Sequence, residues 1–239
     1  MEALQIALLG LGAGGIYGLL AQGLVCIYRG SGVVNFAQGA LTMASAYGFY
    51  QCEVVEGWSP AVALIVVVAI CVLVGVAVQW VIMWHMRGSA PLIRLAATLG
   101  IMTIVESIVE IHYGSTLYLV PQYLPASTTK LFGGLYVPND QLIIFGVGIA
   151  VTAGLWCTYR FTQFGRATRA VAEDQQIASA LGHSPNRVAA VNWGIGCGLA
   201  GLGGCLIVPL TGLNVGNLSD LLLPALAALG LSVALAAPA

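Results

Sequence analysis

The chain has 239 residues, of which 59% are hydrophobic and 7% are charged, with a formal net charge of −1. A soluble domain carries about 25% charged residues, so this composition excludes a soluble core, and the near-zero charge argues against a nucleic-acid partner. A bilayer admits only helices or a closed barrel. Uninterrupted apolar runs such as residues 61–69 lack the alternation of barrel strands. We therefore predict an all-α, polytopic transmembrane bundle.

Long apolar stretches follow one another along the whole chain. A helix needs about 20 mostly apolar residues to cross the hydrocarbon core. The first stretch has no basic residue before it and is longer than a signal-peptide core, so we interpret it as a retained span. We predict about seven spans, over residues 3–28, 32–52, 59–84, 91–111, 140–159, 188–208 and 221–237.

The basic residues are concentrated in three of the connections between these spans. The opposite connections contain mainly acidic residues, with Lys130 as their one cation. The positive-inside rule places the three basic connections in the cytoplasm, the N-terminus outside and the C-terminus inside. The cations of the three connections are Arg29, then Arg87 and Arg94, then Arg160, Arg166, Arg169 and Arg187.

The connection over residues 160–187 is the one substantial water-soluble segment. Apolar residues recur there at helical spacing (Ala170, Ile177, Leu181), which predicts a short amphipathic cytoplasmic helix with a polar face. Gly182 is suited to end that helix, and a Ser-Pro pair soon after it is suited to begin the next span. We interpret residues 1–239 as a single transmembrane domain with this segment as its cytoplasmic loop.

Polar residues inside the predicted spans are candidates for a pathway, because they are costly in hydrocarbon. Asn35 and Gln38 lie near the inner end of the second span and are suited either to line a pathway or to cross-link helices. Asn192 in the sixth span allows the same two interpretations. Thr98 can satisfy its hydroxyl on its own backbone, so alone it is weak evidence. These four residues are the candidate substrate-pathway residues.

Glu106 and Glu110 lie four residues apart, on one face of the fourth predicted span. Near the outer end of that span, the simpler interpretation is that both carboxylates are solvated. The functional alternative is a cation or proton site, which would suit an ion-coupled transporter.

Two matches to the GxGxxG pattern, at residues 10–15 and 196–201, lie inside transmembrane runs and lack the strand that a dinucleotide site requires. Small residues four apart (Gly10, Gly14 and Gly18; Gly194 and Gly198) predict close helix contacts instead. The sequence contains no P-loop, no Ser/His/Asp set and no clustered metal ligands, so we expect no catalytic residue, no metal and no bound cofactor. Six cysteines without a CxxC pair indicate packing residues.

Three segments carry a specific combination of motifs: residues 14–29, residues 33–39 (VVNFAQG) and residues 165–174 (GRATRAVAED). Together they resemble the branched-chain amino-acid ABC transporter permease family, the inner-membrane components of binding-protein-dependent transport systems. Weaker similarity over residues 91–100 and 198–206 extends the resemblance, in order, to about nine-tenths of the chain.

The resemblance implies a subunit of the bacterial or archaeal inner membrane that imports branched-chain amino acids or related small polar solutes, such as urea or short amides. Two cytoplasmic ATPase subunits would use the ATP, and a homologous second permease would lie beside this one in the membrane lipid. A periplasmic or lipid-anchored protein would deliver the solute. The residues matching the segment that docks on the ATPase are Gly165, Arg166, Arg169, Ala170, Glu173, Asp174, Ala178 and Gly182.

The chain departs from the family pattern in two places. Ala40 stands where an acidic residue often follows the NFAQG motif, and residues 224–239 are Ala/Leu-rich where relatives carry Gly-rich final spans. The shorter C-terminus allows a truncated, non-transporting subunit as one alternative. An ion-coupled secondary transporter using Glu106 and Glu110 is the other, and the sequence does not distinguish among solutes.

Overall fold

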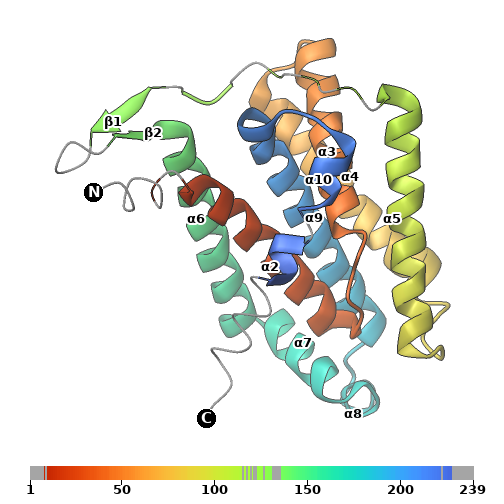
Figure 1. Cartoon of the computed structure of the whole chain (residues 1–239). Helices are drawn as coiled ribbons and strands as arrows, with labels where there is room; N and C mark the ends of the chain where they lie inside the picture. Colours follow the sequence, from red (N-terminus) through yellow and green to blue (C-terminus); the bar gives the residue numbers. More distant parts are fainter. Residues whose placement is uncertain are drawn as a thin grey trace.

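The computed structural model describes residues 8, 10–114, 116, 118, 120, 123–125, 127–130, 136–221 and 223–227. They form a bundle of long helices with one short antiparallel hairpin at its edge (Figure 1). The elements are α2 (Leu11–Ser31), α3 (Gln38–Tyr50), η1 (Gln51–Val55), α4 (Pro60–Val78), η2 (Gln79–Met83), α5 (Pro91–Tyr113), β1 (Thr128–Lys130), β2 (Tyr136–Pro138), α6 (Asn139–Phe161), α7 (Gln163–Glu173), α8 (Gln175–Ala180), α9 (Pro185–Thr211) and α10 (Val215–Ser219).

Five of these helices are long and apolar enough to cross a membrane: α2, α4 with η2, α5, α6 and α9. They confirm the predicted spans at residues 59–84, 91–111, 140–159 and 188–208 as helices. The span predicted at 3–28 is confirmed as a helix from Leu11, and most of residues 3–9 lie outside the described residues. The predicted span at 32–52 is α3 continued by the π-helix η1, and it begins later because residues 32–37 are not helical. The predicted span at 221–237 lies largely outside the described residues. The hairpin β1–β2 was not predicted.

Local sequence explains where several helices begin. Proline is the first residue of α4, α5 and α9, where its missing N–H is not needed and its fixed φ is already helical. In α9 this confirms the predicted start at Pro185, although the Ser184 side chain makes no capping hydrogen bond. Helix α2 ends because Gly32 turns the backbone into the left-handed region at φ 67°.

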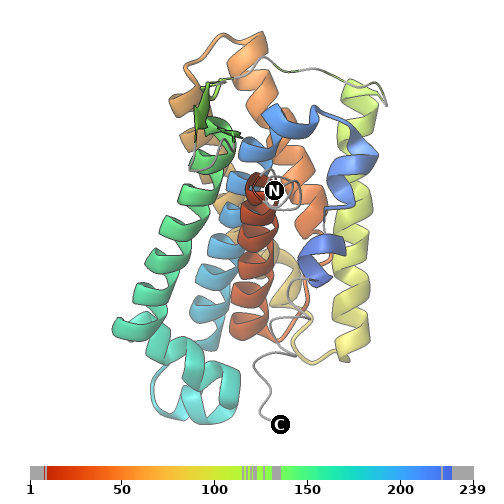
Figure 2. The same cartoon turned by 60° about the vertical axis from the view of Figure 1, so that its left-hand side comes forward.

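Helix α9 lies at the centre of the bundle, packed against α2, α3 and α4 (Figure 2). Glycines allow this close approach: a Cβ added at Gly196 would lie 2.5 Å from the Ile27 side chain, and one at Gly198 would lie 2.8 Å from Val72. Gly194 is similarly close to Val76 of α4. The predicted contact surface at Gly194 and Gly198 is therefore confirmed.

The contact surface predicted on α2 is wrong, because a different face of this helix packs against α6. A Cβ added at Gly14 or Gly18 would have no neighbour within 4 Å, whereas Gly12 and Gly15 lie against Gln141 and Phe145 of α6. A repeat of small residues shows that two helices approach closely, but several faces of α2 carry glycine. The sequence alone did not show which of them meets α6.

The outer helices present their apolar side chains away from the bundle. Only 11% of the most apolar window of α5 and of α6 is buried, against 67% for α9. Ile65, Leu73 and Val81 project from α4 and its extension with about two-thirds of their surface exposed. Such a surface is unfavourable in water and suits hydrocarbon.

The basic residues gather at one end of the bundle. Helices α7 and α8 lie at the end opposite the hairpin β1–β2 in both views (Figures 1 and 2). Arg94 reaches the end of α2, where its Nη1 donates to the Ser31 carbonyl at 3.4 Å, and it lines a small cavity with Arg87 and Gln175. We call this end, which carries the seven arginines, the basic end.

Candidate functional site

The first polar cluster holds the non-helical segment between α2 and α3, and we call Asn35, Gln38 and Thr98 the amide cluster. Asn35 accepts a hydrogen bond from the Ala37 N–H at 3.1 Å and donates to Gln38 Oε1 at 3.3 Å. Gln38 Nε2 donates to the Gly196 carbonyl of α9 at 3.0 Å. All three side chains are fully buried.

Thr98 connects the same segment to α5. Its hydroxyl donates to the Leu95 carbonyl at 2.8 Å and accepts from the Phe36 N–H at 3.3 Å. The sequence left open whether the Thr98 hydroxyl bonds only to its own helix backbone. The structure shows that it also hydrogen-bonds to the non-helical segment between α2 and α3. The amide cluster therefore joins the connection between α2 and α3 to α3, α5 and α9.

The second polar cluster lies at the basic end, and we call Tyr159, Thr168 and Asn192 the junction cluster. The Tyr159 hydroxyl donates to Asn192 Oδ1 at 2.5 Å, and Asn192 Nδ2 donates to the Val188 carbonyl at 2.8 Å and to Thr168 Oγ1 at 3.3 Å. Asn192 is fully buried. One side chain of α9 thus connects α6 with α7.

The two clusters occupy neighbouring positions on α9. Asn192 and Gly196 are four residues apart, which is about one helical turn, or about 6 Å along the axis. The four candidate pathway residues therefore separate into two groups: Asn35, Gln38 and Thr98 come together, and Asn192 lies in the junction cluster. None of them lines any of the four best-formed cavities in the described part of the chain.

The predicted coupling segment forms two short helices instead of one. Thr162 caps α7 by accepting from the Gly165 N–H at 3.2 Å. Asp174 is extended (φ −153°, ψ 115°), which ends α7, and its carboxylate caps α8 by accepting from the N–H groups of Gln176 and Ile177 at 2.7 and 3.0 Å. The cap favours a new helix over continuation of the old one.

Glycines fix the geometry at both ends of this pair. A Cβ at Gly165 would collide with the Tyr159 carbonyl, so the corner between α6 and α7 requires glycine. Gly182 follows α8 at φ 86°, in the left-handed region that favours glycine, and nothing lies near it. The predicted role of Gly182 as a helix stop is confirmed.

The burial pattern of α7 and α8 differs from the predicted stripe. Ile177 and Leu181 are 61% and 70% exposed, because the chain turns at Asp174. The small core beneath the pair is formed instead by Ala167, Val171, Ala178 and Val188.

The predicted coupling residues therefore have two kinds of position. Gly165 and Ala178 are buried, and Ala170 is partly buried. The remaining five lie at the basic end with more of their surface accessible: Arg166, Arg169, Glu173, Asp174 and Gly182.

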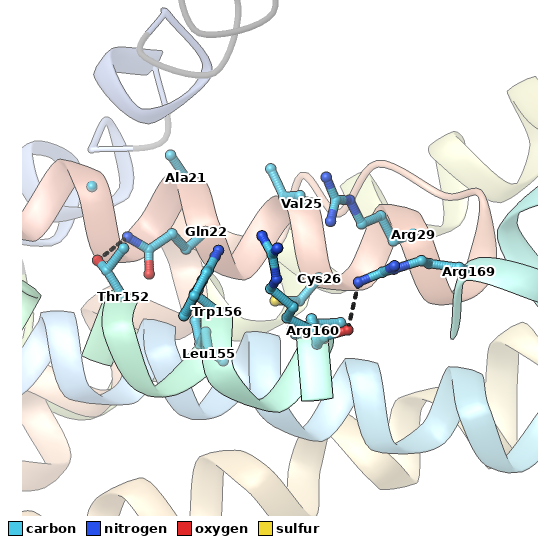
Figure 3. A pocket seen from close by; sticks show the side chains of 12 residues that line it. Ala21, Gln22, Val25, Cys26, Arg29, Thr152, Leu155, Trp156, Arg160 and Arg169 are labelled. Atoms are coloured by element: carbon cyan, nitrogen blue, oxygen red, sulfur yellow. Dashed lines mark hydrogen bonds between the residues drawn. The ribbon is translucent and has the colours of Figure 1, made fainter. Parts of the chain in front are cut away.

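A partly open cavity of about 770 Å³ lies between α2 and α6. Gln22 Nε2 donates to Thr152 Oγ1 at 2.7 Å at one end of it, and Arg29, Arg160 and Arg169 gather at the other (Figure 3). This cavity was not predicted from the sequence. The cavity depends on which face of α2 is turned toward α6, and a hydropathy pattern does not predict that orientation.

A second cavity, of about 390 Å³, lies between α5 and α10 and is lined by Glu106, Glu110, Ser219 and Asp220 among others. Glu106 is half-buried and Glu110 is exposed. Among the described residues, no group of three or more His, Cys, Asp or Glu side chains is placed to hold a metal ion.

Five membrane-length helices with an apolar outer surface, together with buried polar clusters, define a multi-pass helical membrane protein. The chain matches the family described as branched-chain amino acid transport system / permease component over residues 6–236. It belongs to this family.

Individual relatives are distant. The chain is 28% identical over 219 residues to the high-affinity branched-chain amino acid transport system permease protein BraD of Pseudomonas aeruginosa, covering 85% of this chain and 70% of that protein. It is 27% identical over 217 residues to the LivH permease protein of the high-affinity branched-chain amino acid transport system of Escherichia coli, covering 83% and 68%. A probable LivH permease protein of Methanocaldococcus jannaschii is 26% identical over 211 residues. No solved structure matches.

The family assignment confirms the resemblance noted in the sequence. The protein is a multi-pass membrane permease of bacterial or archaeal type, a component of an amino-acid ABC transport system, and it is not itself an enzyme. Membership of this family implies ATPase and solute-binding-protein partners in general terms.

Proposed function

We propose that this chain is the membrane-spanning subunit of an ATP-driven, binding-protein-dependent importer of branched-chain amino acids or related small polar solutes, including urea and short amides. The family match and the names of the relatives support the amino-acid class. A homologous second permease would complete the pathway, and a periplasmic or lipid-anchored binding protein would deliver the solute at the end opposite the basic end. The family favours this function over ion-coupled secondary transport.

The orientation follows from charge. Seven arginines lie at the basic end, and cytoplasmic connections of membrane proteins carry an excess of Lys and Arg. We therefore place the basic end, with α7 and α8, in the cytoplasm and the N-terminus outside. Arg166 and Arg169 would hold α7 at the level of the lipid headgroups.

The observation that carries the proposal is the exposed surface of α7 and α8. Ile177 and Leu181 expose most of their apolar surface beyond the ends of the spans, and the charged side chain of Glu173 in the same segment is also exposed. Apolar side chains rimmed by charge mark a protein-binding surface. Two cytoplasmic ATPase subunits, one for each permease, are the partners that we assign to this surface.

The junction cluster supplies a route from that surface into the bundle. Thr168 of α7 and Tyr159 of α6 both bind Asn192 of α9, and α9 contacts the amide cluster one turn further on at Gly196. An ATPase that grips α7–α8 differently in its two states would shift the equilibrium between inward-open and outward-open bundles. Asn192 then acts as a positioning residue between the coupling helices and the pathway.

The test is the substitution Glu173→Arg, which reverses the charge at the end of α7 without touching the buried core beneath it. We expect the ATPase to be lost from the complex purified in mild detergent and solute uptake to fall at least tenfold, with membrane insertion unchanged. Glu56→Arg makes the same change at an exposed site in the loop between η1 and α4, away from the coupling helices. It should leave the ATPase bound. Normal uptake and normal ATPase retention in the Glu173 variant would refute the coupling role.

A further inference from the structure

The cavity between α2 and α6 combines three features that the transport function does not use. It is partly open, it has an apolar wall formed by Val25, Leu155 and Trp156, and three arginines gather at one end. Trp156 is 54% exposed, so the wall faces outward from the bundle. This exposed wall is part of the surface that α6 would present to the bilayer.

The arginine end carries an uncompensated positive charge. Among the described residues, those lining the cavity include Arg29, Arg160 and Arg169 but no Asp or Glu. Arg160 lies over the Trp156 ring at 5.2 Å from its centroid, and Arg169 Nη2 donates to the Tyr159 carbonyl at 2.9 Å. A guanidinium has five N–H donors, so these contacts leave donors for an oxyanion. Like charges held together in one cavity favour an anionic occupant.

The length of the cavity fits a lipid better than a free ion. From Gln22 to Arg29, and from Thr152 to Arg160, each helix rises by about 10–12 Å. From the arginines, an apolar groove thus extends toward the bilayer centre as far as the Gln22–Thr152 pair. A phosphate or a carboxylate solute would use the arginines and leave this groove empty.

A second copy of the chain is a poorer occupant. Two copies related by a twofold axis bring the same surface of each together, so contact through this face would place one set of three arginines against another. Charge complementarity excludes that pairing and favours an anionic headgroup.

We propose that the α2–α6 cavity binds one anionic phospholipid, with its phosphate held by Arg29, Arg160 and Arg169 and an acyl chain along Val25, Leu155 and Trp156. Basic pockets between transmembrane helices on the cytoplasmic side bind anionic headgroups in this way, and guanidinium groups are suited to bidentate contacts with phosphate. The site requires that α2 and α6 span the membrane, and it rests on the proposed orientation, with the basic end in the cytoplasm. It is independent of the solute and of the ATPase.

The test is native mass spectrometry of the purified full-length protein after exchange into mixed micelles of phosphatidylglycerol and phosphatidylcholine. We expect one phosphatidylglycerol to be retained selectively. Arg29→Gln and Arg160→Gln should each weaken retention about fivefold, and the double variant should weaken it further. Arg187→Gln removes an exposed arginine of the same end that does not line the cavity, and it should change nothing.

Two further arms separate the possible occupants. Ala21→Leu narrows the groove without changing its charge, so it should lower lipid retention even if an arginine variant fails to insert. Inorganic phosphate and leucine at millimolar concentration should not displace the lipid. Equal retention of both lipids, retention unchanged in the double arginine variant, displacement by phosphate or leucine, or crosslinking of a photoreactive group at Val25 to another polypeptide would each overturn the proposal.

Discussion

Asn192 shows how one buried amide can join several helices. Its two polar atoms bind Tyr159, Thr168 and the Val188 carbonyl, so its capacity is almost fully used. The sequence identified Asn192 as a polar residue inside a span and left open a pathway role or a cross-linking role. Its observed contacts are those of a cross-link, and they reach the segment that we assign to the ATPase.

We expect Asn192→Leu to destabilise the protein by about 1–3 kcal/mol, because the Tyr159 and Thr168 hydroxyls lose a partner in a buried site. Thermal unfolding in detergent measures this change. Tyr159→Phe removes only one of the bonds and should cost less. Thr103→Ala, on the exposed face of α5, should be close to neutral. An unfolding midpoint for Asn192→Leu equal to that of Thr103→Ala would show that the cross-link has no role in stability.

At the scale of elements, the coupling segment is a pair of helices whose shape depends on backbone conformation more than on packing. Asp174 ends one helix and caps the next, and Gly182 turns the chain toward α9. A small core and two hydrogen bonds, Asn192 to Thr168 and Arg169 to the Tyr159 carbonyl, hold the pair to the bundle. We expect such an element to open more readily than the spans, as the proposed coupling role requires.

Gly182→Ala tests this dependence on the backbone. A Cβ meets no neighbour there, so its cost is the left-handed conformation alone, about 1–2 kcal/mol. We expect faster hydrogen exchange in α8 with the spans unaffected. Gly88→Ala is the matched control at the same end, since Gly88 also has open space around it but no positive φ. Equal exchange in the two variants would contradict the assignment.

At the scale of the whole molecule, we expect the arginines to determine the orientation of the protein in the membrane. We expect Gln175→Cys in α8 to react with a membrane-impermeant maleimide only after the cytoplasm is opened, and Glu56→Cys to react in intact cells. Both positions are exposed, and Cys157, the one exposed native cysteine, can be replaced to lower the background. Labelling of Gln175→Cys in intact cells would reverse the proposed orientation.

Hydropathy and charge were enough to predict the spans, because the cost of polar groups in hydrocarbon acts on each helix separately. They did not predict which face of α2 meets α6, which Gly12 and Gly15 decide, or the turn at Asp174 that exposes Ile177. Those features depend on contacts between distant segments and on a local competition between a cap and a continuing helix. The α2–α6 cavity was missed for the same reason.

Helix α3 illustrates a further effect of being enclosed by other helices. Ten of its thirteen residues are buried, including Gln38, Thr42 and Ser45, and its neighbours shield it from the lipid. Because these neighbours enclose it, α3 does not have to partition into hydrocarbon alone. It can therefore carry hydroxyl and amide groups that would be costly in a span surrounded by lipid. Its stable residence in the bilayer must therefore wait for α9, which is synthesised about 150 residues later. During biogenesis α3 would have to remain in contact with the insertion machinery until α9 has been synthesised.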